Sequence, residues 1–378
     1  MSFLSVLSAP FGYFIPFVVA LTIIVFIHEM GHFLVARWCG VKVEAFSIGF
    51  GREIFGWDDR HGTHWKLCWL PLGGYVKFEG DANATSLPQA TVDKDAVRSP
   101  GNFHGKKVWQ RALVVVAGPV ANFLLAILIF ACVYAFIGVP ANAPRVEKVM
   151  PGTAAEKAGI QPGDLFTAID GRKIKTFTDV QEVVLIHGGE ELTLTIERNG
   201  KPLQLKLIPD VVVEKDGFGG TFKHGQLGVQ RASEEGLPLN KLSLPAAVSK
   251  GVHETWHIIS VTCKYIGKIF SGTESSKQIG GAISIAKGAG DNASAGFPSF
   301  AYFIGVLSVS VGLINLFPIP MLDGGHLVYY AIEAVLGKPL GPKAQEWGFR
   351  VGLSLVVMLM AFGLWNDLTR VYTMMSGS

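Results

Sequence analysis

The pattern His-Glu-x-x-His occurs twice in this chain of 378 residues, at 28–32 and at 253–257. Residues four apart in a helix share one face, so two histidines at this spacing can bind the same metal ion. The glutamate between them then reaches the water that the metal activates for hydrolysis of a peptide bond. Because the pattern is present twice, its surroundings have to decide which copy carries chemistry.

The first copy contains His28, Glu29 and His32 and interrupts an apolar stretch at about 11–36. Ionisable side chains are costly inside a membrane, where they face a protein interior or a water-filled cavity and mark function. The alternative is a set of buried polar residues that only join helices, but Ser, Asn or Gln would serve that purpose at lower cost. We therefore interpret this copy as the catalytic one.

The second copy, at 253–257, lies outside the apolar stretches of the chain. Apolar residues recur around it at steps of three and four, at Val252, Trp256 and Ile259. This spacing predicts an amphipathic helix at the membrane surface, with the histidines and the glutamate on or near its wet face. A solvated histidine needs no metal, so we interpret the second copy as non-catalytic.

A catalytic zinc ion usually has three protein ligands and one position left for water. The segment 315–326 ends the third apolar stretch with two prolines and then Asp323. By their depth along these stretches, His28 and Asp323 both belong near the cytoplasmic side, so a shared metal is possible. The alternatives are that Asp323 is only a turn residue before glycine, or that His326 is the ligand in its place.

The composition favours a membrane protein, with 49% hydrophobic and 17% charged residues, against about 25% charged in soluble domains. The net charge of +3, without a basic run, argues against a nucleic-acid partner. Four widely spaced cysteines form neither a disulfide framework nor a cysteine metal site. Four apolar stretches predict four transmembrane helices, at about 11–36, 112–139, 297–321 and 351–365.

Lysine and arginine residues crowd the segment between the first two apolar stretches and recur between the last two. The positive-inside rule therefore predicts that both segments are cytoplasmic and that both termini lie outside the cytoplasm. The segment at about 140–296 is then extracytoplasmic. The pattern of the first part of this segment predicts an α+β domain. The expected strands are at 145–150, 165–169, 192–197 and 203–208, and the expected helices are a short one that ends near Gly159 and one at 179–186.

At this point the sequence resembles the site-2 proteases, and most closely the bacterial RseP-like intramembrane metalloproteases. The resemblance covers nearly the whole chain and is carried by four features: HEMGH at 28–32, AGPVANF at 117–123, a PDZ-like domain at about 145–212, and NLFPIPMLDGG at 315–325. It implies that His28, His32 and Asp323 bind one zinc ion per chain and that Glu29 is the general base.

The same resemblance implies further site residues. Asn122 and Asn315 match family asparagines near the active site, with substrate binding or transition-state support as their role. The end of the segment 71–80 resembles a β-loop that enters the membrane beside the site. Strands at about 43–55 and 65–78 can hold an extended substrate by edge pairing, with Gly73 and Gly74 at a turn. Two departures are the single PDZ-like domain, where relatives have two, and Gly281-Ala282 in place of Gly-Pro.

We therefore predict an α-helical polytopic membrane protein with four transmembrane helices, an inserted α+β PDZ-like domain and a membrane-associated β-loop. The predicted order is a first transmembrane helix, a cytoplasmic loop with β-strands, a second transmembrane helix, the PDZ-like domain, an amphipathic linker, a third transmembrane helix, a cytoplasmic loop and a fourth transmembrane helix. The corresponding boundaries are 1–38, 39–106, 107–140, 141–213, 214–296, 297–326, 327–346 and 347–378.

The predicted function is that of an intramembrane zinc endopeptidase in the bacterial inner membrane. The resemblance implies a single-span membrane protein as substrate, either an anti-sigma factor that an upstream site-1-type protease has trimmed or a remnant signal peptide. The PDZ-like domain would act as a substrate gate. A metal transporter that uses His28, His32 and Asp323 as a transit site, and an inactive scaffold, are the alternatives, and Glu29→Gln separates them.

Overall fold

The computed structural model describes residues 3–80, 99–140, 144–174, 176–215, 221–230, 239–271 and 280–376. The chain forms two compact units. The first comprises Met1–Ala135, Ser243–Phe270 and Ile279–Asp367, and the second comprises Phe136–Leu242, Ser271–Gln278 and Leu368–Ser378. A predicted cytoplasmic loop segment, 81–98, lies outside the described residues.

Four helices in the described part of the chain are long and apolar enough to cross a membrane. This agrees with the predicted polytopic membrane protein. The spanning segments are Gly12–Trp38 in α1 (Phe3–Trp38), Val108–Ile137 in α2 (Val108–Cys132) and the π-helical turn η2 (Val133–Ile137), α7 (Phe297–Asn315), and Pro342–Thr373 in α9 (Pro342–Ser376).

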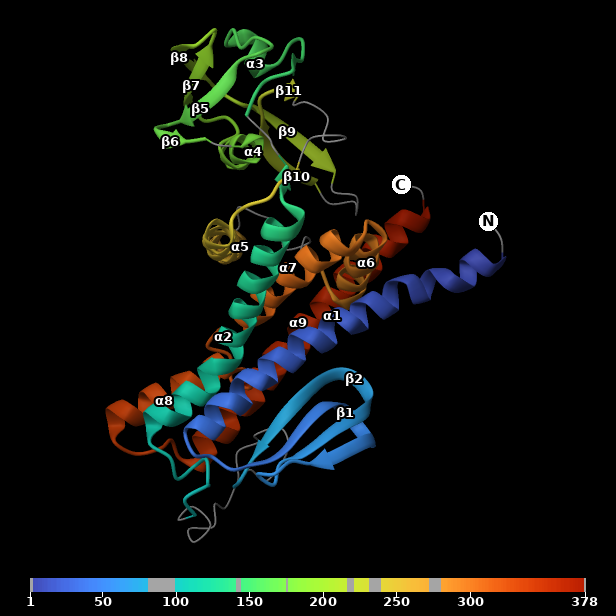
Figure 1. Cartoon of the computed structure of the whole chain (residues 1–378), viewed down its shortest axis with the longest axis vertical. Helices are drawn as coiled ribbons and strands as arrows, with labels where there is room; N and C mark the ends of the chain where they lie inside the picture. Colours follow the sequence, from blue (N-terminus) through green and yellow to red (C-terminus); the bar gives the residue numbers. More distant parts are fainter. Residues whose placement is uncertain are drawn as a thin grey trace. The chain divides into compact units, whose positions relative to one another are not determined.

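The predicted strands after the first helix are present as β1 (Val43–Asp58) and β2 (His64–Phe78). The first half of β1 pairs with 74–78 and also with 64–67, and the second half of β1 pairs with 64–70. Phe46 is fully buried between the sheet and α1 and stacks on Trp65, with ring centroids 4.5 Å apart. The sheet therefore packs against α1, as Figure 1 shows.

The turn between β1 and β2 is anchored to the end of α1 through Asp59. Its carboxylate accepts hydrogen bonds from the Arg37 guanidinium, from the Trp65 indole N–H at 3.1 Å and from two backbone N–H groups of the turn. Burial raises the pKa of Asp59, but these hydrogen bonds outweigh it and hold the pKa well below its ordinary value. The anchor is therefore fully ionised at neutral pH.

The third apolar stretch is interrupted at its two prolines, as expected, but the helix ends earlier than the predicted boundary at residue 326. Helix α7 ends at Asn315, and a new helix, α8 (Asp323–Leu336), lies where we predicted a cytoplasmic loop. Pro318 and Pro320 explain the break because proline has no N–H for a helical hydrogen bond. Helix α8 ends at Gly337, which has the left-handed conformation that favours glycine, with φ at 68°.

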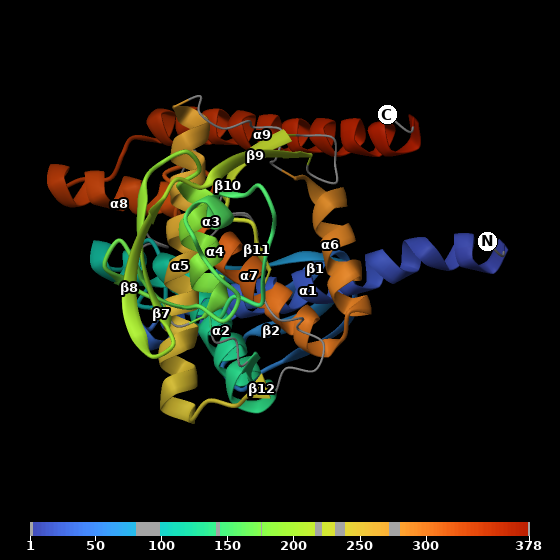
Figure 2. The ribbon, with the colours of Figure 1, turned by 90° about the horizontal axis from the view of Figure 1, so that it is seen from above.

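Two further helices complete the first unit: α5 (Leu244–Phe270), which packs against α2 and α7, and α6 (Ala282–Ser294), which packs against α1 and α7 (Figure 2). The backbone N–H groups of Gly281, Ile283 and Ser284 donate to the carboxylate of Asp367. Segment 281–286 is therefore the first turn of α6, and α9 satisfies its free N–H groups.

The second copy of the histidine–glutamate pattern lies on α5, but its glutamate is not on a wet face. The Tyr302 hydroxyl donates to Glu254 Oε1 at 2.5 Å, and Tyr134 also hydrogen-bonds this carboxylate. Glu254 therefore joins α5 to the helices that it packs against, whereas Trp256 is 67% exposed. The prediction of a solvated glutamate was wrong because the sequence does not show which helices pack on α5.

The second unit contains an antiparallel sheet in the order β6-β5-β7-β8, beside helix α4. Its buried core includes Phe166, Leu194 and Val180. The bounds are β5 (Leu165–Ile169), β6 (Arg172–Lys173), β7 (Leu192–Arg198), β8 (Lys201–Leu207), α3 (Ala154–Lys157) and α4 (Phe177–Ile186), so most of the predicted elements are confirmed.

The second unit differs from the prediction at both ends. The predicted first strand, 145–150, is reduced to β4 (Lys148–Val149), which pairs with β11 (Val229–Gln230). Because of this pairing the unit extends beyond residue 213, where we placed its end. The other strands are β3 (Val139–Pro140), β9 (Asp210–Lys215), β10 (Thr221–Gln226) and β12 (Leu239–Asn240).

Replacing Asp59 by Asn tests the anchor of the sheet. The variant loses charge-assisted hydrogen bonds, so the free energy of local opening of β1 and β2 should fall by about 1–3 kcal/mol. Hydrogen exchange of 43–78 in the detergent-solubilised protein measures it. Because the pKa of Asp59 is lowered, the effect should be constant from about pH 5 to 9 and disappear only as the pH falls through that pKa.

The neighbouring residue supplies a matched control. The Asp58 side chain is 74% exposed and pairs with His64 at the surface, so Asp58→Asn should leave the exchange rates unchanged. Equal protection of residues 43–78 from hydrogen exchange in wild type and Asp59→Asn would show that the sheet does not depend on this anchor.

Candidate metal centre

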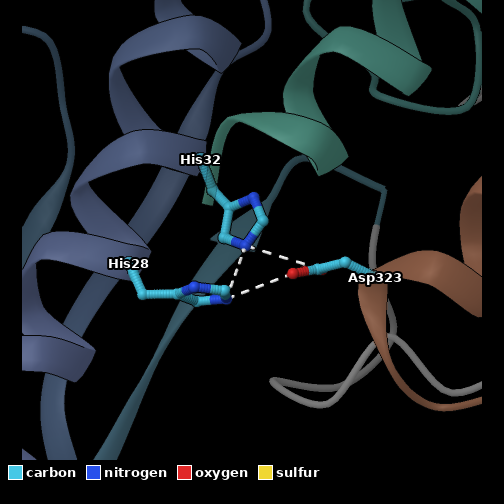
Figure 3. Close-up of side chains that lie close together, drawn as sticks. All are labelled: His28, His32 and Asp323. Carbon is cyan, nitrogen blue, oxygen red and sulfur yellow. Dashed lines mark hydrogen bonds and ion pairs between the residues drawn. The ribbon is translucent and has the colours of Figure 1, made fainter. Parts of the chain in front are cut away.

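His28 and His32 lie on one face of α1, and Asp323 is the first residue of α8. Figure 3 shows the three side chains converging. The Nε2 atoms of the two histidines are 3.2 Å apart, and they lie 3.2 and 3.6 Å from the nearest Asp323 carboxylate oxygens. The side chains are only 11%, 12% and 16% exposed. The structure thus brings the three predicted ligands together.

The spacing and chemistry of these atoms fit zinc. A tetrahedral zinc ion with bonds of about 2.0–2.1 Å has its ligand atoms about 3.3 Å apart. The two Nε2 atoms are separated by 3.2 Å, and each lies near a different Asp323 oxygen, at 3.2 and 3.6 Å. Asp323 Oδ2 is buried and has no hydrogen-bond partner in the described part of the chain. Two imidazoles and one carboxylate leave one tetrahedral position free, as a catalytic site requires.

The far side of each imidazole is held by α2. The Nδ1 atom of His32 lies 2.8 Å from the Val114 carbonyl oxygen, and Nδ1 of His28 lies 3.2 Å from the Asn122 side-chain amide. Histidines that bind a metal through Nε2 donate from Nδ1 to such second partners. Asn122 Oδ1 is buried without a partner, and exchanging the amide oxygen and nitrogen would place this acceptor opposite His28.

This arrangement changes the interpretation of Asn122. We predicted a role in substrate binding or transition-state support, but the residue is fully buried behind His28. In this position its amide contacts Nδ1 of His28 and can orient that imidazole. Helix α2 therefore supplies the orienting groups for both histidines.

Gly118 on α2 makes room for the histidines. A Cβ atom at this position would overlap Nε2 of His32 and come within 2.9 Å of His28 Cε1. Any side chain at residue 118 would therefore displace the ligands. Sequence reasoning included this glycine in the motif 117–123 but assigned it no role, because only the packing of α1 on α2 shows how close it lies.

Glu29 faces the sheet next to the two histidines. Its carboxylate accepts a hydrogen bond from the backbone N–H of Val76 on β2. A Cβ atom on Gly74 would lie 3.4 Å from Glu29 Cγ and 2.7 Å from the Ser47 carbonyl oxygen, so glycine allows β2 to approach. Gly73 has φ at 115°, a turn conformation that favours glycine, and packs on Phe50 instead.

Two other predicted candidates come from the segments on either side of the break between α7 and α8. Asn315 is the last residue of α7 and is half-buried, and His326 lies one turn along α8. In the described chain, the metal-capable group contains Asp323 and does not include His326. The histidines at 253 and 257 belong to no such group in the described residues either.

Comparison with known proteins places this chain among peptidases. The sequence profile of peptidase family M50 matches residues 16–359. The chain belongs to peptidase family M50. A protein of Rhizobium meliloti that is provisionally named a zinc metalloprotease is 44% identical over 373 residues, which cover 98% of this chain and all of the relative. Metalloprotease MmpA of Caulobacter vibrioides is 40% identical over 375 residues, 93% of this chain and 94% of the relative.

These matches confirm the predicted family, the enzyme class and zinc as the cofactor. They do not test which residues hold the zinc or which residues meet a substrate. The ligand assignment remains a prediction that rests on the geometry described above.

Gly118→Ala is the sharpest test of that geometry. The added methyl group would displace both imidazoles, so the purified protein should lose most of its zinc while its helix content stays the same. Gly267→Ala on α5 is the matched control, because a Cβ there meets nothing within 4 Å. Zinc content by atomic emission and helicity by circular dichroism measure both variants. Full zinc occupancy in Gly118→Ala would exclude these histidines as the ligands.

Proposed function

We propose that this chain is an intramembrane zinc endopeptidase that hydrolyses a peptide bond in or near the transmembrane segment of a single-span membrane protein. The observation that carries the proposal is the group of His28, His32 and Asp323 with Glu29 beside it. The histidines and Glu29 belong to a helix that is long and apolar enough to cross a membrane. Ionisable side chains are energetically unfavourable in such a helix, so their presence there indicates a function.

Each residue then has a role. His28, His32 and Asp323 hold the zinc ion, which when bound polarises the scissile carbonyl and lowers the pKa of water. Glu29 takes the proton of the attacking water and passes it to the leaving nitrogen. The Val76 N–H group holds the Glu29 carboxylate in place. Asn315, at the end of α7, supports the developing oxyanion.

The substrate has to be extended at the scissile bond, because a helix hides its carbonyl groups in its own hydrogen bonds. The segment 74–78 of β2 pairs with β1 on one side only among the described strands. Its other side is turned towards the site, since the Val76 N–H group points at Glu29. An unwound substrate can pair with this edge as an added strand, and Gly74 allows its close approach.

The location and gating follow from the predicted topology. The four candidate membrane-spanning helices of the described chain and the positive-inside rule support a multi-pass protein of the bacterial inner membrane with both termini and the second unit extracytoplasmic. The second unit, a PDZ-like domain in this proposal, admits substrates that an upstream site-1-type protease has shortened. Trimmed anti-sigma factors and remnant signal peptides are single-span substrates of this kind.

A comparison of two glutamate variants tests the proposal. Glu29→Gln should lower the rate of cleavage of a single-span test substrate in detergent by at least about 100-fold. The variant protein should still bind about one zinc ion per chain. Glu254→Gln is the matched control, because this glutamate follows the first histidine of the other copy of the pattern and hydrogen-bonds Tyr302 and Tyr134.

The two variants separate the possible functions. If Glu29→Gln cleaves normally, hydrolysis does not use this site and the proposal fails. If only Glu254→Gln is inactive, the chemistry belongs to α5. A metal transporter would keep its transport in Glu29→Gln and lose it when His28 or His32 is replaced.

A further inference from the structure

A buried ion pair joins α2 to α8 at a distance from the metal centre. Arg111 Nη2 lies 2.6 Å from Glu333 Oε1, and the two side chains are only 10% and 14% exposed. The guanidinium also donates from Nε to the Lys106 carbonyl oxygen at 3.2 Å and lies over the Tyr330 ring, 4.9 Å from its centroid. The proposed chemistry uses none of these groups.

The ion pair and the metal centre lie at opposite ends of the same helix pair. Along α2, Asn122 lies eleven residues after Arg111, or about 16 Å at the helical rise per residue. Along α8, Glu333 lies ten residues after Asp323, or about 15 Å. The two helices, which are in contact, therefore run antiparallel over nearly equal lengths between these two points.

Helix α8 packs mainly on α2, while Leu327 and Tyr330 also contact the buried cluster that includes Phe33 of α1, and Tyr329 lies against Gly348 of α9. The break at 316–322 separates it from α7, and α2 is the helix that it contacts most extensively in the described chain. Its outer face carries Val335 and Leu336, which are 86% and 56% exposed. The position of Asp323 therefore depends on how α8 is seated on α2.

The ion pair can favour one position of α8 along α2. A slip of α8 by one turn would move Asp323 by about 5.4 Å and would separate both charges from their partners. Charged groups that are largely removed from water cannot be left unpaired without a large cost, and setting register is the best-attested use of buried ionic groups. Arginine is suited to this use because its planar donors hold a carboxylate in one geometry.

We propose that the Arg111–Glu333 ion pair fixes the register of α8 on α2 and thereby holds Asp323 at ligand distance from His28 and His32. Both are positioning residues. The inference rests on the proposed ligand set of the metal centre, and it adds a determinant of metal affinity at the other end of the helix pair.

Zinc affinity of the full-length protein in detergent tests the proposal. The variants are Arg111→Gln, Glu333→Gln and the exchange Arg111→Glu with Glu333→Arg. Each single variant should bind zinc about 10- to 100-fold more weakly in titration against a chelator. The visible spectrum of the cobalt-substituted protein should also change. The exchange should recover most of the affinity and the spectrum, which a merely stabilising pair would not require.

Two further variants, Arg350→Gln and Arg111→Lys, serve as controls. Arg350→Gln breaks an exposed ion pair with Glu346 on α9 and should leave zinc affinity unchanged. If Arg111→Gln does not fold, Arg111→Lys retains the charge without the planar donors and should lose affinity to a smaller extent. Wild-type affinity and cobalt spectrum in the single variants would overturn the proposal, as would a folded exchange variant that binds zinc as weakly as they do.

A reference variant separates this inference from the proposed function. His28→Ala should lose zinc binding whether or not the ion pair sets the register. If His28→Ala binds zinc like wild type, the ligand set is wrong and both proposals fall. If it loses zinc while Arg111→Gln and Glu333→Gln do not, only the register proposal falls.

Discussion

The close approach of two imidazoles and a carboxylate inside an apolar helix bundle is the constraint on which the rest of the first unit depends. His28, His32 and Asp323 come from segments far apart in the chain, yet their ligand atoms lie 3.2–3.6 Å from one another. Polar groups in such a place are unfavourable unless each has a partner. The neighbouring helices therefore have to supply partners at defined positions.

Helix α2 meets most of this requirement. It contacts α1, α5, α7 and α8, and one face of it provides the carbonyl group of Val114, the amide of Asn122 and the space at Gly118. Its cytoplasmic-side end, in the predicted topology, carries Arg111, which pairs with α8. A single apolar helix without any acidic residue thus contacts both histidines and also packs against α8, which begins at Asp323.

The two copies of the histidine–glutamate pattern show how context decides chemistry. Glu29 lies beside two metal-capable histidines and meets a backbone N–H group of β2. Glu254 meets two tyrosine hydroxyl groups and serves to join α5 to α2 and α7. Both copies share the two histidines and the glutamate, and their different flanking sequences already separate them; the structure adds which groups pack against each glutamate.

The amino-acid sequence by itself determined the membrane class, the four spanning helices and the strands β1 and β2, and it singled out His28, Glu29 and His32 as candidates. Each depends on hydropathy, alternation or spacing, which are local properties of the chain. Spacing left Asp323 and His326 as alternatives, and the family resemblance favoured Asp323. Only the tertiary structure showed that α8 is a separate helix, that Asn122 lies behind His28, and that Glu254 bonds to tyrosines. It also showed the backbone partners Val114 and Val76, because a carbonyl or an N–H group is the same at every residue and leaves no signal in the sequence.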